Sequence, residues 1–212
     1  MEIVWLGHAC FRIRGREATV LTDPCPPSSG YNIGKPTADI VTLSHDHDAH
    51  SYTRAVSGHP VILNASGEYE IHGAFITGIS THHDDKKGEE LGSNVAFIVE
   101  MEDIRICHLG DLGHTPSAEQ AEDMTGVDIL FVPVGGGSTI DGVRAAEVVS
   151  LLEARLVIPM HYKTEALKDN LEPADKFLKE MGVSAVEPLP KLTVSRGSLP
   201  ADTQVMLLDY RR

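Results

Sequence analysis

The chain has 212 residues and 42% hydrophobic side chains, enough for one domain (residues 1–212) with a complete core. It carries 18 Lys and Arg against 31 Asp and Glu, a formal net charge of −13. Because so acidic a surface repels phosphate backbones, we expect no nucleic-acid partner.

The first half of the chain is rich in short predicted strands. Apolar and β-branched runs bounded by Gly and Pro indicate them. They cover residues 2–6, 10–14, 19–22, 39–44, 61–64 and 71–79. Residues 24–36 and 82–93 are predicted loops, and a short helix is predicted near 52–56.

The second half alternates strands with helices. Residues 94–101 and 104–109 predict a β-hairpin, and Thr115-Pro116 is typical of a helix start, with Gly126 ending that helix. Apolar spacing predicts a further helix over 139–154. The remaining predictions are strands at 127–134, 156–159, 191–194 and 205–208 and a helix at 173–181. This order of strands and helices favours a fold in which two sheets pack together with helices on the outside.

The compartment is predicted from cysteine usage and hydropathy. Three cysteines far apart in sequence suit a reducing environment and argue against a disulfide scaffold. No signal peptide and no apolar stretch of transmembrane length is evident. We therefore expect a soluble cytoplasmic protein with no membrane partner, and a homo-oligomer is possible.

Histidines concentrate at the ends of predicted strands. The segment His45-Asp46-His47-Asp48-Ala49-His50 places three imidazoles within six residues, directly after a buried strand. His or Asp also follows apolar strands at His82-His83-Asp84, at His108-Leu109-Gly110-Asp111 and at His161. Neutral imidazole is the commonest protein metal ligand, so convergence of these loops on a metal is the simplest explanation.

These segments resemble the metallo-β-lactamase superfamily, whose loop motif reads His-x-His-x-Asp-His. More narrowly, the sequences Trp5-Leu6-Gly7-His8-Ala9, His108–His114 and Ile158–Tyr162 are similar to lactonase-like metal-dependent hydrolases, the branch that includes ascorbate-6-phosphate lactonase. The resemblance implies an α/β (α+β) four-layer αββα sandwich with a metal site at one edge. It implies these metal ligands: His45, His47 and His83 for a first ion, His50 and His161 for a second, and Asp111 as the bridge.

Some assignments stay open at this point. His82 is the alternative to His83, because adjacent histidines leave the register ambiguous. His8 and Asp23 are either neighbours of the site or turn residues. The Asp of the loop motif is Ala49 here, which has no donor atom, so the second site either is weak or borrows water or Asp48.

The expected function is metal-dependent hydrolysis of a small-molecule ester or lactone. Zinc or manganese, one or two ions per chain, suits these N and O donors, and a bound ion lowers the pKa of water from about 15.7 to about 7, giving hydroxide. Asp111 would bridge and orient the nucleophile, and His114 is a candidate proton donor. The alternatives are a phosphodiesterase or nuclease of the same superfamily and a non-catalytic metal-binding protein.

Overall fold

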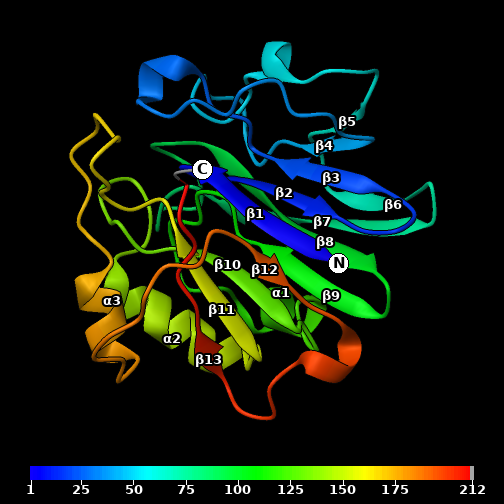
Figure 1. Ribbon diagram of the computed structural model, residues 1–212. Coiled ribbons are helices and arrows are strands. Elements are labelled where there is room, and N and C mark those ends of the chain that lie inside the picture. The colour runs from blue at the N-terminus through cyan, green and yellow to red at the C-terminus, as the bar shows by residue number, and fades with distance from the viewer. Residues whose placement is uncertain (211–212) are drawn as a thin grey trace.

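The computed structural model describes residues 1–210 and contains two β-sheets (Figure 1). The first sheet has the strand order β12-β1-β2-β3-β4-β5. Its strands are β1 (Glu2–Gly7), β2 (Cys10–Arg14), β3 (Thr19–Thr22), β4 (Ile40–Thr42), β5 (Val61–Leu63) and β12 (Leu192–Thr193). Since β2 runs antiparallel to both β1 and β3, and β4 runs parallel to β3, the strands β1, β3 and β4 end at the same edge.

The second sheet has the order β13-β11-β10-β9-β8-β7-β6. Its strands are β6 (Gly67–Ile71), β7 (Ala74–His82), β8 (Ser93–Met101), β9 (Ile104–His108), β10 (Ile129–Pro133), β11 (Leu156–Met160) and β13 (Gln204–Val205). Antiparallel β8 lies between β7 and β9, and β9, β10 and β11 are parallel. The strands β7, β9 and β11 therefore also end at a common edge.

The main core lies between the two sheets, where the inward side chains of both meet. Phe11 of β2 and Phe131 of β10 are fully buried there, with ring centroids 4.0 Å apart and the rings nearly parallel. Such an aromatic pair contributes about 1 kcal/mol beyond the area it buries. The two sheets therefore pack face to face and hold their strand ends in fixed relation to each other.

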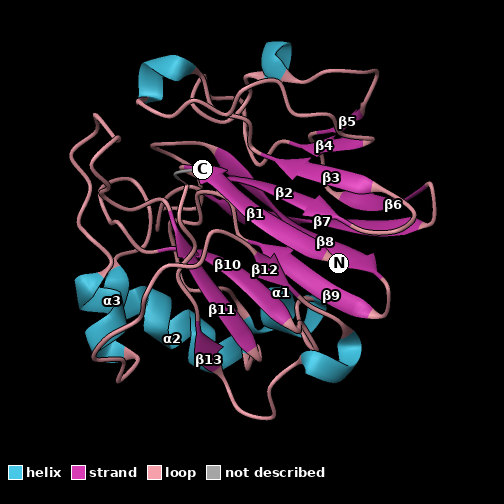
Figure 2. Cartoon of the chain, in the orientation of Figure 1, coloured by secondary structure: helices cyan, strands magenta, loops and turns pink. Residues whose placement is uncertain are grey.

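Helices cover the outer face of the second sheet (Figure 2). They are α1 (Ala118–Asp123), α2 (Gly142–Leu152) and α3 (Asp175–Glu180). The buried face of α2 carries the apolar residues at helical spacing that predicted it, such as Ala145 and Val149. The predicted fold class, an α/β chain with two packed sheets, is confirmed.

The outer face of the first sheet is covered differently. Val4, Leu21 and Val41 point outward from it and pack against Tyr31 and Ile33 of the long Pro-rich loop. That segment carries the short 3₁₀ helix Pro27–Ser29, and a second, Thr53–Ala55, follows β4. Loop and 3₁₀ turns thus form this layer where the αββα description expected α-helices.

Several observed boundaries differ from the predicted ones, and two of the differences have a clear local cause. Helix α1 begins after Ser117 because the Ser117 hydroxyl accepts from the Gln120 amide while the Gln120 side chain accepts from the Ser117 amide, a capping box. The expected strand over 71–79 is two strands, because His72-Gly73 turns the chain with both residues at positive φ. Within residues 1–210, no helix has the length and apolar character needed to cross a membrane.

Candidate metal centre

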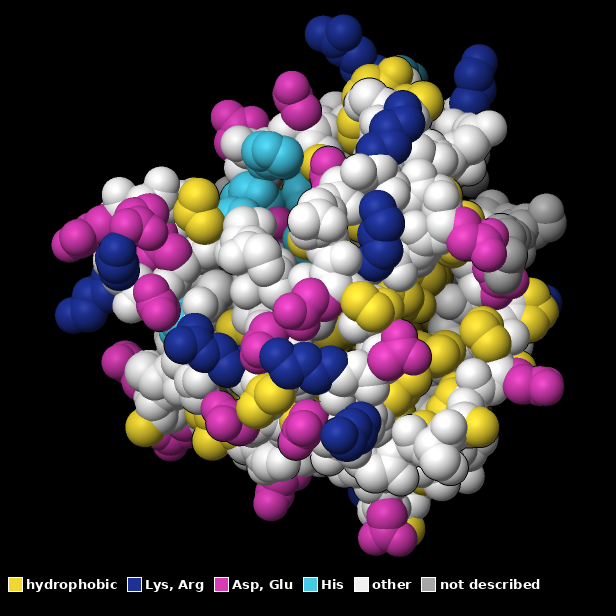
Figure 3. Space-filling view, turned by 90° about the vertical axis from the view of Figure 1, so that its left-hand side faces the viewer, with side chains coloured by type: hydrophobic (Ala, Val, Ile, Leu, Met, Phe, Trp, Pro, Cys, Tyr) yellow, Lys and Arg dark blue, Asp and Glu magenta, His cyan; other side chains and the backbone are white. Residues whose placement is uncertain are grey.

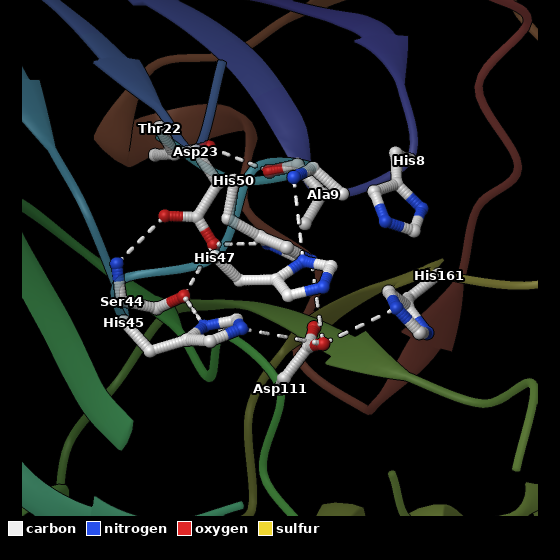
Figure 4. Close-up of polar contacts among 12 residues, drawn as sticks. His8, Ala9, Thr22, Asp23, Ser44, His45, His47, His50, Asp111 and His161 are labelled. Atoms are coloured by element: carbon white, nitrogen blue, oxygen red, sulfur yellow. Dashed lines mark hydrogen bonds and ion pairs between the residues drawn. The ribbon is translucent and has the colours of Figure 1, made fainter. Parts of the chain in front are cut away.

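The site forms where strand ends of both sheets meet. β1, β3 and β4 of the first sheet and β7, β9 and β11 of the second each deliver one or more side chains to it (Figure 4). These side chains belong to His8, Asp23, His45, His50, His83, Asp111 and His161. Residues up to 153 positions apart in the chain thereby come together, as the loop pattern predicted.

Asp111 is at the centre of the cluster. Its Oδ2 atom lies 3.3 Å from the Nε2 atoms of His50, His83 and His161 and 3.9 Å from the Nε2 atom of His45. The Asp111 carboxylate is buried, and its other oxygen has no hydrogen-bond partner among the described residues. Four imidazole nitrogens therefore face one carboxylate out of contact with bulk water.

Two of these imidazoles are oriented by hydrogen bonds on their outer side. The Nδ1–H group of His50 donates to Oδ2 of Asp23 at 2.9 Å. The Ser44 hydroxyl donates to the same oxygen at 2.5 Å and accepts from Nδ1 of His45 at 2.9 Å. With Nδ1 carrying the proton, a neutral imidazole presents the Nε2 lone pair to Asp111, the arrangement found in metal-bound histidines.

His83 is oriented in the same way from the second sheet. Its Nδ1–H group donates to the backbone oxygen of Ser138 at 3.0 Å. The adjacent His82 is the last residue of β7, and its ring lies beside His114 instead, with ring centroids 5.5 Å apart. The structure thus brings His83, and not His82, to Asp111.

The buried carboxylates and imidazoles of the site shift one another's pKa values. Burial opposes the charged form of His50, but the carboxylates of Asp111 and Asp23 outweigh burial and raise the pKa of His50 to about 10. Burial, with the charge of His50, lowers the pKa of His45 to about 4. Burial alone would raise the pKa of Asp111, yet His161 and His50 hold it well below its ordinary value. The centre therefore stabilises positive charge beside Asp111.

The side chains present fit a divalent metal ion. Among the described residues, the buried atoms that lack a hydrogen-bond partner include Nε2 of His45, Oδ1 of Asp111 and Nδ1 of both His8 and His161. Unpaired buried polar atoms are rare in proteins because each costs about 1–3 kcal/mol. Imidazole nitrogen with carboxylate oxygen suits Zn²⁺ or Mn²⁺.

Possible ligand groups overlap within the cluster. One group joins His45, His83 and Asp111, and a second joins His45, His47 and His50, each with donor atoms within 4.8 Å of one another. His47 is exposed at the mouth of the site, where its Nδ1 accepts from the Ala49 amide. The six predicted ligands thus gather in one place, His47 at the periphery.

His114 lies outside this cluster. Its Nε2 atom accepts from the backbone amide of His82 at 3.1 Å, and its Nδ1 atom bonds to the backbone oxygen of Thr115 at 2.9 Å. Both ring nitrogens are therefore engaged with backbone atoms, one of them the amide of His82, which precedes His83. The role of proton donor stays a prediction, and these contacts favour a positioning role.

Some residues of the site were not predicted as part of it. Ser44 and Ser138 orient ligands, but a single serine carries no recognisable pattern. Asn94 accepts from the Asp111 amide at 2.9 Å and donates to the backbone oxygen of Leu109, which fixes the turn that holds Asp111. Nothing in the sequence marks Asn94, because its role depends on the pairing of β8 with β9.

A cavity of about 300 Å³ opens onto the cluster, and histidine side chains gather at the surface there (Figure 3). Besides the histidines, its lining includes Asp46, Leu91, Ser138, Asp169 and Leu171, and no Lys or Arg from the described part of the chain. A larger cavity of about 990 Å³ lies elsewhere, beside Arg16, Arg105 and Arg196, and contains none of the candidate ligands. The smaller cavity is therefore the candidate substrate site.

Comparisons with known proteins agree with this geometry. The family model described as a β-lactamase superfamily domain matches residues 2–161. A UPF0173 metal-dependent hydrolase from Thermoplasma volcanium is 30% identical over 197 residues, covering 77% of this chain and 84% of the relative. A Thermotoga maritima structure titled as a Zn-dependent hydrolase of the metallo-β-lactamase superfamily is 39% identical, with a TM-score of 0.81 over 98% of this chain and 97% of the other.

More distant structures share the fold alone. An isothiocyanate hydrolase from Delia radicum gut bacteria has a TM-score of 0.67 at 15% identity, covering 92% of this chain and 99% of that one.

The resemblance to the superfamily is confirmed, whereas the lactonase branch stays a prediction. The matched domain, the relatives and the clustered ligands agree, and the chain belongs to the metallo-β-lactamase superfamily, among its UPF0173 metal-dependent hydrolases.

Proposed function

We propose that this protein hydrolyses a small, uncharged ester or lactone at the metal centre. The observation that carries the proposal is the convergence of three Nε2 atoms, each 3.3 Å away, on one buried oxygen of Asp111 beneath a cavity of about 300 Å³. When bound there, a divalent ion such as Zn²⁺ or Mn²⁺ supplies Lewis acidity, which activates water and polarises the substrate oxygen.

The side chains of the centre would have separate roles in binding the metal, orienting water and selecting the substrate. His45, His50, His83 and His161 would hold the metal with Asp111, and the outward hydrogen bonds described above keep the ligand rings pointed inward. Among the described residues Oδ1 of Asp111 has no hydrogen-bond partner, and this oxygen would orient the attacking water. A cavity at the small end of the usual range for ligand sites selects a small substrate.

The lining of the cavity supports a neutral substrate over a phosphodiester. Phosphate recognition commonly uses Arg or Lys, and the described lining contains neither but includes Asp46 and Asp169. The formal charge of −13 further disfavours a nucleic acid. These features favour ester or lactone hydrolysis over the nuclease alternative. Measurable turnover of a substrate distinguishes an enzyme from a non-catalytic metal-binding protein.

The test is hydrolysis by purified protein stripped with a chelator and reloaded with Zn²⁺ or Mn²⁺. We expect turnover of lactones or carboxylic esters that disappears on stripping and returns on reloading, with little turnover of bis-p-nitrophenyl phosphate. Asp111→Asn should lower kcat/KM by about 10³-fold or more, since several kcal/mol of stabilisation are lost and each 1.36 kcal/mol is tenfold. No turnover of any lactone, ester, amide or phosphoester by metal-loaded protein would overturn the proposal.

A further inference from the structure

Backbone contacts hold His8 in the candidate metal centre. It follows β1 directly, with φ at +54°, a conformation that costs energy in a residue other than glycine. Its backbone oxygen accepts from the indole N–H of Trp5 at 3.0 Å and from the amide of His161 at 3.2 Å. The chain therefore fixes His8 against His161, a residue that itself contacts Asp111.

The ring of His8 lies among candidate ligands (Figure 4). Its centroid is 4.4 Å from that of His161 and 4.7 Å from that of His50. The side chain is 3% exposed, and its Nδ1 atom has no hydrogen-bond partner among the described residues. The three imidazoles offer donor atoms within 4.8 Å of one another. A buried ring that needs a partner thus faces two potential metal ligands.

Apart from His45 and His47, which are assigned to the first ion, the loop His45–His50 offers no donor besides His50 for a second ion. Ala49 stands where the motif predicted an aspartate, and Ala49 lines the cavity without a donor atom. Asp48 is exposed and belongs to none of the donor groups found in residues 1–210. A second ion bound by His50 and His161 therefore lacks the carboxylate ligand that the motif would supply from this loop, while His8 is available.

We propose that His8 supplies the missing ligand, so that His8, His50 and His161 bind a second metal ion which Asp111 bridges to the first. Zinc-bound nitrogens in a tetrahedral site lie about 3.4 Å apart, so donor atoms within 4.8 Å need only small ring movements to close on one ion. Exchanging a carboxylate for an imidazole makes this position richer in nitrogen. We therefore expect it to prefer Zn²⁺ over Mn²⁺.

The test measures how many metal ions each chain binds. The inference rests on the metal binding of the proposed function but not on hydrolysis, so its test needs no substrate. Metal content is measured after gel filtration, and the Kd of each ion is measured by stepwise calorimetric titration with Zn²⁺. We expect two ions in the wild-type chain and one in His8→Ala, with the Kd of the second ion raised by about 100-fold or more, since even residues that only orient ligands change affinity 10–100-fold. Retention of the first ion shows that the rest of the centre is intact.

A rescue variant makes the test specific. His8→Ala combined with Ala49→Asp should regain the second ion, because a carboxylate returns to the loop. His72→Ala, an exposed histidine at the turn after β6, is the matched control and should retain both ions. A wild-type chain that binds one ion, or a His8→Ala chain that binds the second ion with unchanged Kd, would overturn the proposal.

A measurement on the unaltered chain covers the case in which His8→Ala fails to fold. In ¹⁵N-labelled wild-type protein, the ring nitrogens of His8 should shift with the second equivalent of Zn²⁺. Ring signals of His8 that do not respond to either equivalent would contradict its assignment as a ligand.

Discussion

At the scale of single residues, one buried carboxylate links two candidate metal ligands to the sheet that carries them. Asp23 follows β3 with φ at +35°, and its carboxylate accepts from the Ser44 amide, the Ser44 hydroxyl and the His50 ring. Because Ser44 in turn contacts His45, one side chain fixes two candidate ligands. Strain in a non-glycine residue persists where several contacts enforce it, as they do here.

Asp23→Asn should therefore weaken metal binding without removing a ligand. An amide in place of the carboxylate loses the charge that orients the Nδ1–H group of His50, and we expect the metal Kd to rise by about 10–100-fold. Calorimetric titration with Zn²⁺ measures the change. Asp39→Asn is the control, since Asp39 accepts from the Thr19 amide at the opposite end of the sheet. An equal effect of both variants would contradict the orienting role.

A substitution of His114 separates its two possible roles. Because one ring nitrogen of His114 holds the backbone amide of His82, beside His83, and the other contacts the Thr115 oxygen, we expect His114→Ala to lower metal affinity. The shape of the pH–rate profile of the metal-saturated enzyme should stay unchanged. A proton donor would behave in the opposite way, since its loss removes one limb of the profile while metal content is retained. The profile and the ion count together decide between them.

The sequence could predict most of this site, and the exceptions have structural reasons. Three imidazoles in one loop and the His and Asp residues at strand ends indicated side chains that the structure brings together around Asp111, and their role as metal ligands stays a prediction. The choice between His82 and His83 depends on where β7 ends, because neighbouring side chains in an extended strand point to opposite sides. The place of His8 depends on contacts with Trp5 and His161, which no local pattern reveals.

At the scale of elements, one side chain connects two of the helices that cover the second sheet. Helix α2 begins after Asp141, whose carboxylate accepts from the Arg144 amide at 3.0 Å and from Lys176 of α3 at 2.6 Å. One side chain thus caps α2 and ties it to α3. The helical periodicity of α2 was readable from the sequence, whereas this cap was not, because its second partner lies 35 residues away.

Asp141→Asn should reduce stability in a pH-dependent way. The hydrogen bond from Lys176, then that from the Arg144 amide, lowers the pKa of Asp141, so its charge stabilises the native state above the unfolded pKa of about 3.9. This contribution is lost as the pH falls through the lowered native pKa. Asparagine still caps a helix, so we expect a loss of about 0.5 kcal/mol at pH 7 that shrinks toward pH 3.

Urea unfolding at the two pH values measures this difference. Lys176→Met removes the same ion pair and leaves the cap, and it should match Asp141→Asn at pH 7. Asp141→Ala removes the cap as well and should cost about 1 kcal/mol more. A loss for Asp141→Asn that is as large at pH 3 as at pH 7 would show that the charge of Asp141 plays no part.

At the scale of the whole molecule, the candidate metal centre lies between the strand ends of the two sheets. The candidate ligands His8, His45 and His50 follow strands of the first sheet, and the candidate ligands His83, Asp111 and His161 follow strands of the second. The sequence predicted nearly all the strands but not their partition, because pairing order is set by contacts between distant segments. The loop layer outside the first sheet was unpredictable for the same reason, since Tyr31 is buried only by tertiary packing.

Because the centre spans both sheets, metal removal should lower the thermal stability of the whole chain. An ion that binds the native state alone adds about 2.7 kcal/mol at a free concentration of 100 times Kd. For a chain of this length each kcal/mol shifts Tm by about 2–4 °C, so we expect a rise of about 5–10 °C on adding Zn²⁺ to stripped protein. Scanning calorimetry with and without the ion measures the shift. Asp111→Asn is the control and should show a much smaller rise, because the central carboxylate that contacts both sets of ligands is lost. An equal shift in both proteins would place the stabilising ion elsewhere on the molecule.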